Sequence, residues 1–201
     1  YRNGSDLLDS ASFPLITIVH LKKGFNLINA PSNTHYLKDA YSFLRAIDNG
    51  LKVEKVSRYN RQRGVFEVAV FNPDGTTGGD NFPVVSGEGL ELSLREDMDI
   101  EISQNSCPLF DLKTGFNLVS TPCDTGDMTS FSFLRATGDG TVILNIQRFN
   151  PVTGEFETAG YFNGGIVGVD FPLQAGEGYI VTMVQEVSSM DPGALNVIAP
   201  P

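Results

Sequence analysis

Glutamates that recur at matching positions are the side chains of this sequence best suited to acid–base chemistry: Glu67, Glu88, Glu157 and Glu177. Two carboxylates held about 5 to 10 Å apart hydrolyse glycosidic bonds, one acting as acid and the other as base or nucleophile. Because a catalytic pair rarely occurs twice in one small chain, we expect local structural roles instead. Glu88 would accept N–H groups of its own turn or pair with Arg45. Glu177 would do the same with Arg135.

Arginines also recur, and their setting predicts structural ion pairs. Arg45 and Arg135 both lie inside the sequence Ser-Phe-Leu-Arg-Ala, on short predicted helices beside apolar residues. An arginine packed in this way needs a carboxylate or carbonyl partner. The alternative is an anionic ligand held by the planar guanidinium fork. The same two alternatives apply to Arg58 and Arg148. For all four arginines we prefer the structural ion pair to an anionic ligand.

Oxygen-bearing side chains cluster in one glycine-rich loop, and calcium is the ligand that such a loop would hold. They are Asn72, Asp74, Thr76, Asp80 and Asn81. A second, looser group consists of Asp124, Asp127 and Asp139. Calcium needs roughly six to eight oxygen ligands, and no calcium loop of about twelve residues is matched. Because Asp and Asn are equally typical of ordinary turns, calcium stays open and no other cofactor is expected.

No other motif of known chemistry is present in the sequence. The two histidines, His20 and His35, stand alone, whereas a zinc site needs several Cys or His ligands at close spacing. The sequence contains no Gly-x-Ser-x-Gly, His-Glu-x-x-His, phosphate-binding loop or dinucleotide-binding fingerprint. We therefore expect His20 to be an ordinary strand residue and the chain not to be an enzyme.

The charge balance argues against two large classes of partner. The net charge is −10, so nucleic acid and anionic membrane surfaces would be repelled. No apolar run of about 18 residues exists that could insert across a bilayer. The sequence starts at Tyr1 without an initiator methionine, so we expect a processed chain whose leader has been removed.

Two cysteines, Cys107 and Cys123, lie eight residues on either side of Gly115. If residues 109–113 and 116–120 pair across a turn at that glycine, the two cysteines face each other and can form a disulfide. Such a bond would indicate an oxidising, extracellular compartment. Two free thiols are the alternative.

An internal duplication determines the predicted architecture. Five blocks return in the same order, and the offset between the copies falls only from 91 to 89 residues. The blocks of the first copy are 21–28, 42–46, 58–60, 64–67 and 82–89, and those of the second are 112–119, 132–136, 148–150, 154–157 and 171–178. The structural signature of the repeat consists of Gly24, Asn26, Arg45, Arg58, Glu67 and Glu88, with Gly115, Asn117, Arg135, Arg148, Glu157 and Glu177.

Each copy is predicted to contain about five strands and one short helix. Residues 16–21 and 25–29 are β-prone runs on either side of Lys23-Gly24, which is typical of a hairpin turn. Apolar residues spaced by three and four predict a helix over 38–47. The expected fold class is mainly β with one short helix per repeat, as two tandem copies of a small antiparallel β barrel or sandwich. The short link between the copies favours close contact.

The predicted domain boundaries follow the duplication. The N-terminal extension is 1–14, the first β repeat 15–100, the second β repeat 101–190 and the Pro/Gly-containing tail or linker 191–201. A covalent linker of this kind lets a module act as a spacer or as one arm of a multivalent binder.

Three blocks of the second copy match a known pattern. Residues 115–120 are Gly-Phe-Asn-Leu-Val-Ser, 149–156 are Phe-Asn-Pro-Val-Thr-Gly-Glu-Phe, and 176–181 are Gly-Glu-Gly-Tyr-Ile-Val. They resemble a module of secreted and surface-attached bacterial proteins, whose usual form has Gly-Trp-Asn-Leu-Ile-Ser, Tyr-Asp-Pro-x-Thr-Gly-x-Trp and Gly-Glu-Gly-Tyr-x-Val. In the first copy Leu90 replaces the aromatic residue of the last block. In place of the tryptophans stand Phe25, Phe66, Phe116 and Phe156.

The resemblance covers most of residues 15–187 and implies a non-catalytic module, extracellular or at the cell surface. We expect a structural or interaction module whose partners are proteins or neighbouring domains of one assembly. A second version is a filament subunit, in which residues 13–19 or 194–199 add a strand to a neighbour's sheet edge. Specificity is expected in the loops that differ between the copies, 72–81 and 163–170.

The competing class is a carbohydrate-binding accessory module of a secreted enzyme. Such a module binds a glycan on exposed aromatic faces, and the chain has no tryptophan. The tyrosines that could present such a face are Tyr36, Tyr41, Tyr161 and Tyr179.

Overall fold

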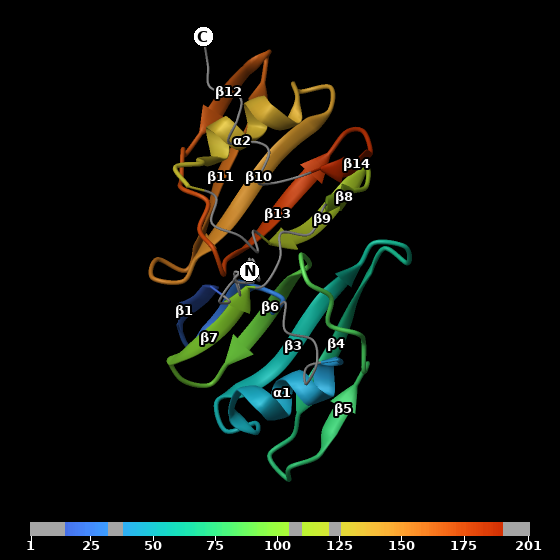
Figure 1. Cartoon of the computed structure of the whole chain (residues 1–201), viewed down its shortest axis with the longest axis vertical. Helices are drawn as coiled ribbons and strands as arrows, with labels where there is room; N and C mark the ends of the chain where they lie inside the picture. The colour runs from blue at the N-terminus through green and yellow to red at the C-terminus, as the bar shows by residue number, and fades with distance from the viewer. Residues whose placement is uncertain (1–14, 32–37, 105–109, 121–125, 191–201) are drawn as a thin grey trace, which may run out of the picture.

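A computed structural model of the chain describes residues 15–31, 38–104, 110–120 and 126–190. Within these residues the chain is mainly β, with fourteen strands and two short helices in two similar halves. Figure 1 shows the halves stacked along the long axis, the first copy in blue to green and the second in yellow to red. The described strands form no closed barrel, so the sandwich-like form of the prediction is confirmed.

The elements of the two copies follow one order. The first copy contains β1 (Leu15–Leu21), β2 (Gly24–Asn29), α1 (Ala40–Asp48), β3 (Val53–Asn60), β4 (Val65–Phe71), β5 (Thr77–Gly79), β6 (Gly89–Leu94) and β7 (Met98–Gln104). The second contains β8 (Phe110–Leu112), β9 (Gly115–Ser120), α2 (Ser130–Thr137), β10 (Ile143–Asn150), β11 (Glu155–Phe162), β12 (Gly165–Gly168), β13 (Gly178–Met183) and β14 (Val187–Met190). The prediction of about five strands per copy misses β5 and β7 in the first.

Strand pairing differs from the predicted hairpin. β1 and β2 are consecutive, yet β1 pairs with β7 and β2 pairs with β6, so Lys23-Gly24 is not a hairpin turn. Each copy forms a two-stranded sheet and a five-stranded antiparallel sheet, in the orders β2-β6-β3-β4-β5 and β9-β13-β10-β11-β12. Gly24 and Gly115, with φ of 93° and 88°, make the bend that sends the chain from one sheet to the other. β7 crosses the predicted boundary at residue 100 and belongs to the first copy through β1.

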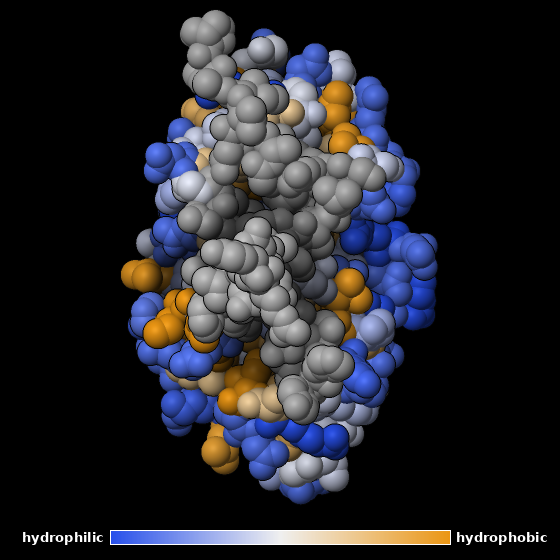
Figure 2. All heavy atoms as spheres, in the orientation of Figure 1, coloured by the Kyte–Doolittle hydropathy of each residue, from blue (hydrophilic) through white to orange (hydrophobic). Residues whose placement is uncertain are grey.

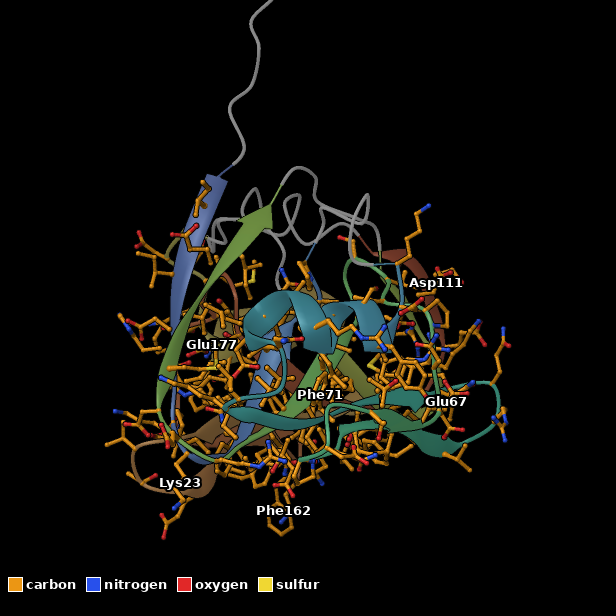
Figure 3. All side chains as sticks on the ribbon, turned by 90° about the horizontal axis from the view of Figure 1, so that it is seen from below. Lys23, Glu67, Phe71, Asp111, Phe162 and Glu177 are labelled. Atoms are coloured by element: carbon orange, nitrogen blue, oxygen red, sulfur yellow. The ribbon has the colours of Figure 1, made fainter. Side chains whose placement is uncertain are left out.

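Each copy has its own hydrophobic core between the five-stranded sheet, the helix and the two-stranded sheet. Side chains alternate along the strands, so every second residue faces this core. Figure 3 shows Phe71 of β4 in the region of α1, which packs on the sheet. Fully buried side chains of the first core include Ile28, Leu44, Val56, Leu90 and Leu92, and those of the second include Leu134, Ile146, Ala159, Tyr179 and Val181.

The helices begin and end as their sequences predict. Asp39 caps α1 and Thr129 caps α2, and each accepts a hydrogen bond from the backbone N–H of a serine three residues later. Asn49, in a left-handed conformation with φ of 55°, ends α1. The predicted helix over 38–47 is therefore confirmed as α1. No helix among the described residues is long and apolar enough to cross a membrane.

The two copies differ most at the hairpin that ends each five-stranded sheet. Asn163 and Gly164 form a two-residue turn between β11 and β12, both with positive φ. The first copy has one residue more here: five residues separate the pair Phe71 and Thr77, and four separate the equivalent pair Tyr161 and Ile166. This length change accounts for the fall of the sequence offset from 90 to 89.

Candidate functional site

Both copies contain the same largely buried ion pair between neighbouring strands. Arg58 Nε donates to Glu67 Oε2 at 2.7 Å, and its second-copy equivalent, Arg148 Nε, donates to Glu157 Oε2 at 2.5 Å. The residues of each pair lie directly opposite each other on adjacent antiparallel strands. The predicted structural pairing of Arg58 and Arg148 is confirmed.

Further hydrogen bonds keep these two carboxylates ionised. The second carboxylate oxygen accepts from Asn60 at 2.9 Å in the first copy and from Asn150 at 3.1 Å in the second. Desolvation raises the pKa of Glu67, but hydrogen bonds from Asn60 and Arg58 outweigh it and the pKa lies below its usual value. At Glu157 the Asn150 bond is the largest cause of a lowered pKa. Each carboxylate therefore joins two strands and has both oxygens in use.

The other two repeated glutamates lie where the copies meet. Carboxylate oxygens of Glu88 lie 3.5 Å from a guanidinium nitrogen of Arg58 and 3.9 Å from one of Arg61. Glu177 accepts a hydrogen bond from the hydroxyl of Tyr179 at 2.8 Å. Burial is the largest influence on both carboxyls and raises the pKa of each above its usual value. Their protonation therefore depends on the contact that buries them.

The helix arginines have different neighbours from those predicted. Arg45 points from α1 to Thr77 of β5, whose hydroxyl accepts a hydrogen bond at 3.4 Å. Arg135 occupies the matching position on α2. The predicted pairing of these arginines with Glu88 and Glu177 is wrong, because strand neighbours occupy the two carboxylates.

The loop predicted to bind calcium is closed by its own hydrogen bonds. Asp74 Oδ1 accepts from the backbone N–H and the hydroxyl of Thr76, at 3.0 and 2.6 Å, and Asn72 Nδ2 donates to that hydroxyl at 3.0 Å. Asn81 Oδ1 accepts from the backbone N–H of Tyr41. Of the described residues, no three His, Cys, Asp or Glu side chains gather closely enough to hold a metal ion. These side chains form turns, and calcium binding stays a prediction.

The histidine and cysteine predictions have separate outcomes. His20 is an exposed residue of β1, as predicted, and its Nδ1 lies 2.7 Å from Asp99 Oδ1 on β7. Cys107, Cys123 and His35 lie outside the described residues. The prediction of a hairpin that would align the two cysteines is wrong, because β8 pairs with β14 and β9 pairs with β13. The disulfide itself stays a prediction.

The largest feature that sequence reasoning misses is the contact between the copies. Phe25 of β2 packs edge-on against two rings of the second copy, with centroids 4.7 and 5.9 Å away. Phe116, its counterpart, packs against two rings of the first copy at 4.6 and 5.8 Å. Because equivalent residues are exchanged, an approximate twofold axis relates the copies. The two clusters are Phe25 with Phe149 and Phe156, and Phe116 with Tyr59 and Phe66.

Backbone groups join the copies in the same reciprocal way. The N–H of Asn29 donates to the C=O of Gly176 at 2.9 Å, and the N–H of Ser120 donates to the C=O of Gly87 at 3.3 Å. Between these bonds, Ser120 Oγ donates to Asn29 Oδ1 at 2.5 Å. The contact covers the C-terminal ends of the edge strands β2 and β9, which would otherwise be open to pairing with another chain.

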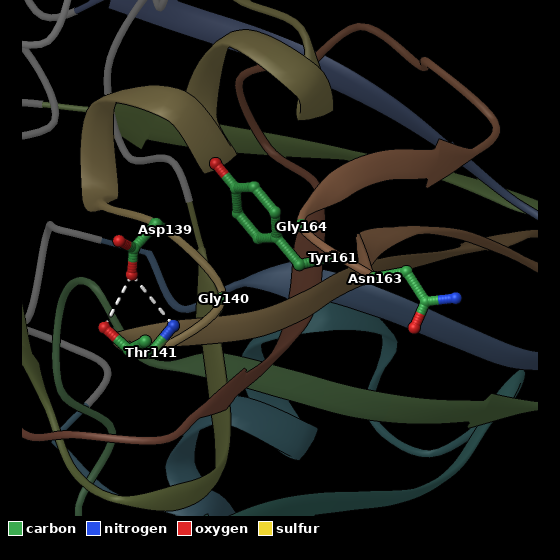
Figure 4. A pocket seen from close by; sticks show the side chains of 6 residues that line it. All are labelled: Asp139, Gly140, Thr141, Tyr161, Asn163 and Gly164. Carbon is green, nitrogen blue, oxygen red and sulfur yellow. Dashed lines mark hydrogen bonds between the residues drawn. The ribbon is translucent and has the colours of Figure 1, made fainter.

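A hollow of about 390 Å³ lies on the second copy, between the loop after α2 and the β11–β12 turn (Figure 4). Its lining consists of Asp139, Gly140, Thr141, Tyr161, Asn163 and Gly164. Asp139 Oδ1 accepts from the hydroxyl and backbone N–H of Thr141 at 2.6 and 2.9 Å, and these bonds lower the pKa of the carboxyl. The lining therefore combines one carboxylate, backbone groups and one aromatic ring.

The tyrosines considered for glycan contact have unequal positions. Tyr161 lines the hollow, with its hydroxyl bonded to the C=O of Gly138 at 2.8 Å. Tyr179 is fully buried, and Tyr41 donates its hydroxyl to the C=O of Gly79. Tyr36 lies outside the described residues. Carbohydrate binding stays a prediction.

Comparison with other proteins adds no homologue from which a role could be transferred. No protein-family model, no curated protein sequence and no solved structure matches this chain.

Proposed function

We propose that this chain is a non-catalytic structural or interaction module of an extracellular or cell-surface protein or assembly. In this proposal the two fused repeats act as one rigid body with two different outer ends. The observation that carries it is a difference between repeated and non-repeated side chains. Recurring polar residues such as Arg58 and Glu67 bind within the chain, whereas the exposed residues at the two outer ends differ.

The outer edge of the second sheet exposes apolar side chains where the first has none. Phe162, Val167 and Val169 are 67%, 50% and 50% exposed, on or beside β11 and β12. The corresponding residues of the first copy are Asn72, Gly78 and Asp80. Figure 3 shows Phe162 projecting from the molecule. In the coloured part of Figure 2 the apolar areas are small and separate, among hydrophilic ones. Exposed apolar groups gathered on a free sheet edge are typical of contact surfaces, so we assign partner binding to this end.

A photo-reactive residue at this end tests the assignment. Phe162 is replaced by p-benzoylphenylalanine in the full chain, which is then irradiated on intact cells of the source organism. The matched control carries the same residue at Asn72, the counterpart in the first copy. The proposal expects one adduct of defined mass from position 162 and none from position 72. Equal labelling from both positions, or none from either, contradicts it.

A filament subunit is the second candidate, favoured by the uncharged edge of β12, beside which no further strand pairs among the described residues. From Tyr161 to Val169 the sequence has no charged residue, whereas the first-copy loop has Asp74 and Asp80. Uncharged edge strands readily accept a strand from a neighbouring chain.

Light scattering coupled to size exclusion tests the filament candidate, with and without millimolar calcium. Association that grows with concentration and is lost in Val167→Lys would support it, with Gly78→Lys on β5, the counterpart position, as the matched control. A calcium-dependent mass would in addition assign the aspartate loops as ligands. A monomer of 21.8 kDa in every buffer eliminates this candidate.

A further inference from the structure

The first copy binds a guanidinium group of its own at the end of its sheet. Nη1 of Arg95 donates to the C=O groups of Gly50 and Val53, both at 3.2 Å. Nη2 of Arg95 donates to the C=O of Phe71 at 3.3 Å. Three backbone acceptors therefore receive one planar cation, an arrangement that suits the fixed fork of arginine.

The hollow of the second copy lies at the corresponding place. The repeat aligns Gly50 with Gly140 and Phe71 with Tyr161, and both second-copy residues line the hollow. The counterpart of Arg95 is Val184, which is 45% exposed. The backbones at the two positions match. The N–H of Arg95 donates to the C=O of Lys52, and the N–H of Val184 donates to the C=O of Val142, the equivalent residue. A valine side chain has no donor, so this position of the second copy supplies no guanidinium. The next residue, Gln185, donates its side-chain Nε2 to the C=O of Thr141 at 2.9 Å.

The aromatic ring beside the glycine differs as well. A Cβ on Gly50 would lie 1.9 Å from the Phe71 ring, so that ring lies across the glycine and fills the space. A Cβ on Gly140 would meet Tyr161 Cβ at 3.0 Å and the ring carbons Cγ and Cδ1 at 3.4 and 4.0 Å. The tyrosine ring extends instead to the C=O of Gly138. The new ring position leaves space beside Gly140, which lines the hollow.

The lining is suited to a cation that donates several hydrogen bonds. Asp139 is ionised at neutral pH, since the bonds from Thr141 lower the pKa of its carboxyl. The Tyr161 ring, which also lines the hollow, offers a π face for a planar cation. Arg135 acts electrostatically on Tyr161 and partly offsets the carboxylate.

We propose that the hollow between Asp139, Tyr161 and Asn163 binds a guanidinium group supplied from outside the chain. The site would accept either a free guanidino compound or an arginine side chain of a partner protein. It extends the proposed function but does not depend on the apolar end at Phe162.

Titration of the ¹⁵N-labelled full chain with N-acetyl-arginine amide measures the site directly. The proposal expects saturable shifts of the amide signals of Gly140, Thr141 and Gly164, with an affinity in the millimolar range, roughly −4 kcal/mol. N-acetyl-citrulline amide has the same shape without the charge and should bind at least ten-fold more weakly. Equal binding of citrulline, or shifts without saturation over the whole acidic surface, would overturn the proposal.

Filling the hollow from within is the second test. Val184→Arg should supply the missing guanidinium, weaken binding of the arginine probe at least ten-fold and raise the unfolding midpoint by about 2 to 4 °C. Val184→Thr, the matched control, leaves the hollow open and should keep the affinity within two-fold. Asp139→Asn should weaken binding three- to ten-fold. Unchanged affinity in both Val184→Arg and Asp139→Asn contradicts the site.

The source of the guanidinium is distinguished by two further probes, agmatine and the peptide Gly-Gly-Arg-Gly-Gly. Tighter binding of agmatine assigns the site to a free guanidino compound. Tighter binding of the peptide assigns it to an arginine of a partner chain. Failure of both probes rejects the site but leaves the cross-linking test at Phe162 unaffected, because the two surfaces are probed separately.

Discussion

Ser120 and Asn29 hydrogen-bond to each other at 2.5 Å, although they occupy the same position in the two copies. Both side chains are fully buried. A contact between equivalent residues places the approximate twofold axis between them. Because each copy uses the same surface, such a contact is closed and cannot add a third unit. Growth of an assembly would therefore need a different surface, such as the free edge of β12.

The axial hydrogen bond makes the first prediction. Ser120→Ala removes the hydroxyl donor and leaves the Asn29 amide oxygen buried, so the free energy of unfolding should fall by about 1 to 3 kcal/mol. Urea denaturation measures this loss. Thr153→Ala, at an exposed turn, is the control and should change stability by less than about 0.5 kcal/mol. A Ser120→Ala loss as small as the control's would show that the bond adds nothing.

The aromatic clusters predict equal and additive losses. Phe25→Ala and Phe116→Ala each remove a half-buried ring that packs against two rings of the other copy, at a cost of about 1 to 2 kcal/mol. The double variant should lose the sum, because the clusters are separate. Phe162→Ala, at a 67% exposed ring, should cost less than about 0.5 kcal/mol in the same denaturation experiment. Losses at Phe25 or Phe116 no larger than this control would be incompatible with a buried contact.

The close approach of the two backbones predicts intolerance of any side chain there. A Cβ on Gly178 would lie 2.9 Å from the backbone oxygen of Ile28 and 3.0 Å from its nitrogen. Gly178→Ala should therefore cost more than about 2 kcal/mol, as overpacking does. Gly165→Ala is the control, because only the Phe162 carbonyl oxygen approaches it, at 3.9 Å. Thermal unfolding that does not separate the two variants would refute the close contact.

Burial of Glu177 predicts a pH dependence with a definite sign. Its pKa is raised in the folded state, chiefly by desolvation, above the ordinary value of 4.5. The stability from this group is therefore present below about pH 4.5 and is lost as the pH rises through the folded pKa. Glu177→Gln should be more stable than the natural chain at pH 7.5 and equal to it near pH 4.

The pH prediction is checked by the unfolding midpoint measured across this range. Glu155→Gln, at an exposed position of the second copy, is the control and should follow the natural chain at every pH. A Glu177→Gln curve parallel to that of the natural chain would mean that the carboxyl is not desolvated.

The fold class and the helices could be predicted because their signals are local or repeated. Alternating apolar residues predict strands, and the spacing of Tyr41, Leu44 and Ile47 predicts α1. The partner of β1 could not be predicted in this way. A turn signal such as Lys23-Gly24 says that the chain bends, whereas pairing depends on which distant strand covers the core face.

The contact between the copies has a signal in the sequence, but the signal cannot be interpreted from one repeat alone. Aromatic residues stand at positions 25 and 66 and again at 116 and 156. Within one repeat they lie on the outer face of the sheet, so they resemble either misplaced core residues or exposed ones. The other copy covers them only in part: Phe25 and Phe116 are half-buried, and Phe66 and Phe156 stay 46% and 47% exposed. The position of that other copy is not contained in any local pattern.

The hollow could not be predicted for a different reason. The hollow lies where the first copy binds Arg95, whose counterpart in the second copy is Val184. This difference can be interpreted only when the three backbone C=O groups that accept from Arg95 are known. The sequence does not show the direction in which those C=O groups point.

Hydrogen exchange of a first-copy core variant tests most directly the central claim that the two repeats form one body. Leu92 is fully buried in the first core, and Leu92→Ala should cost about 2 to 5 kcal/mol. If the copies unfold together, the most protected amides of the second core, such as those of Ile146 and Val181, should lose the same free energy of exchange. Undiminished protection of these second-copy amides would show two independent units and contradict the account.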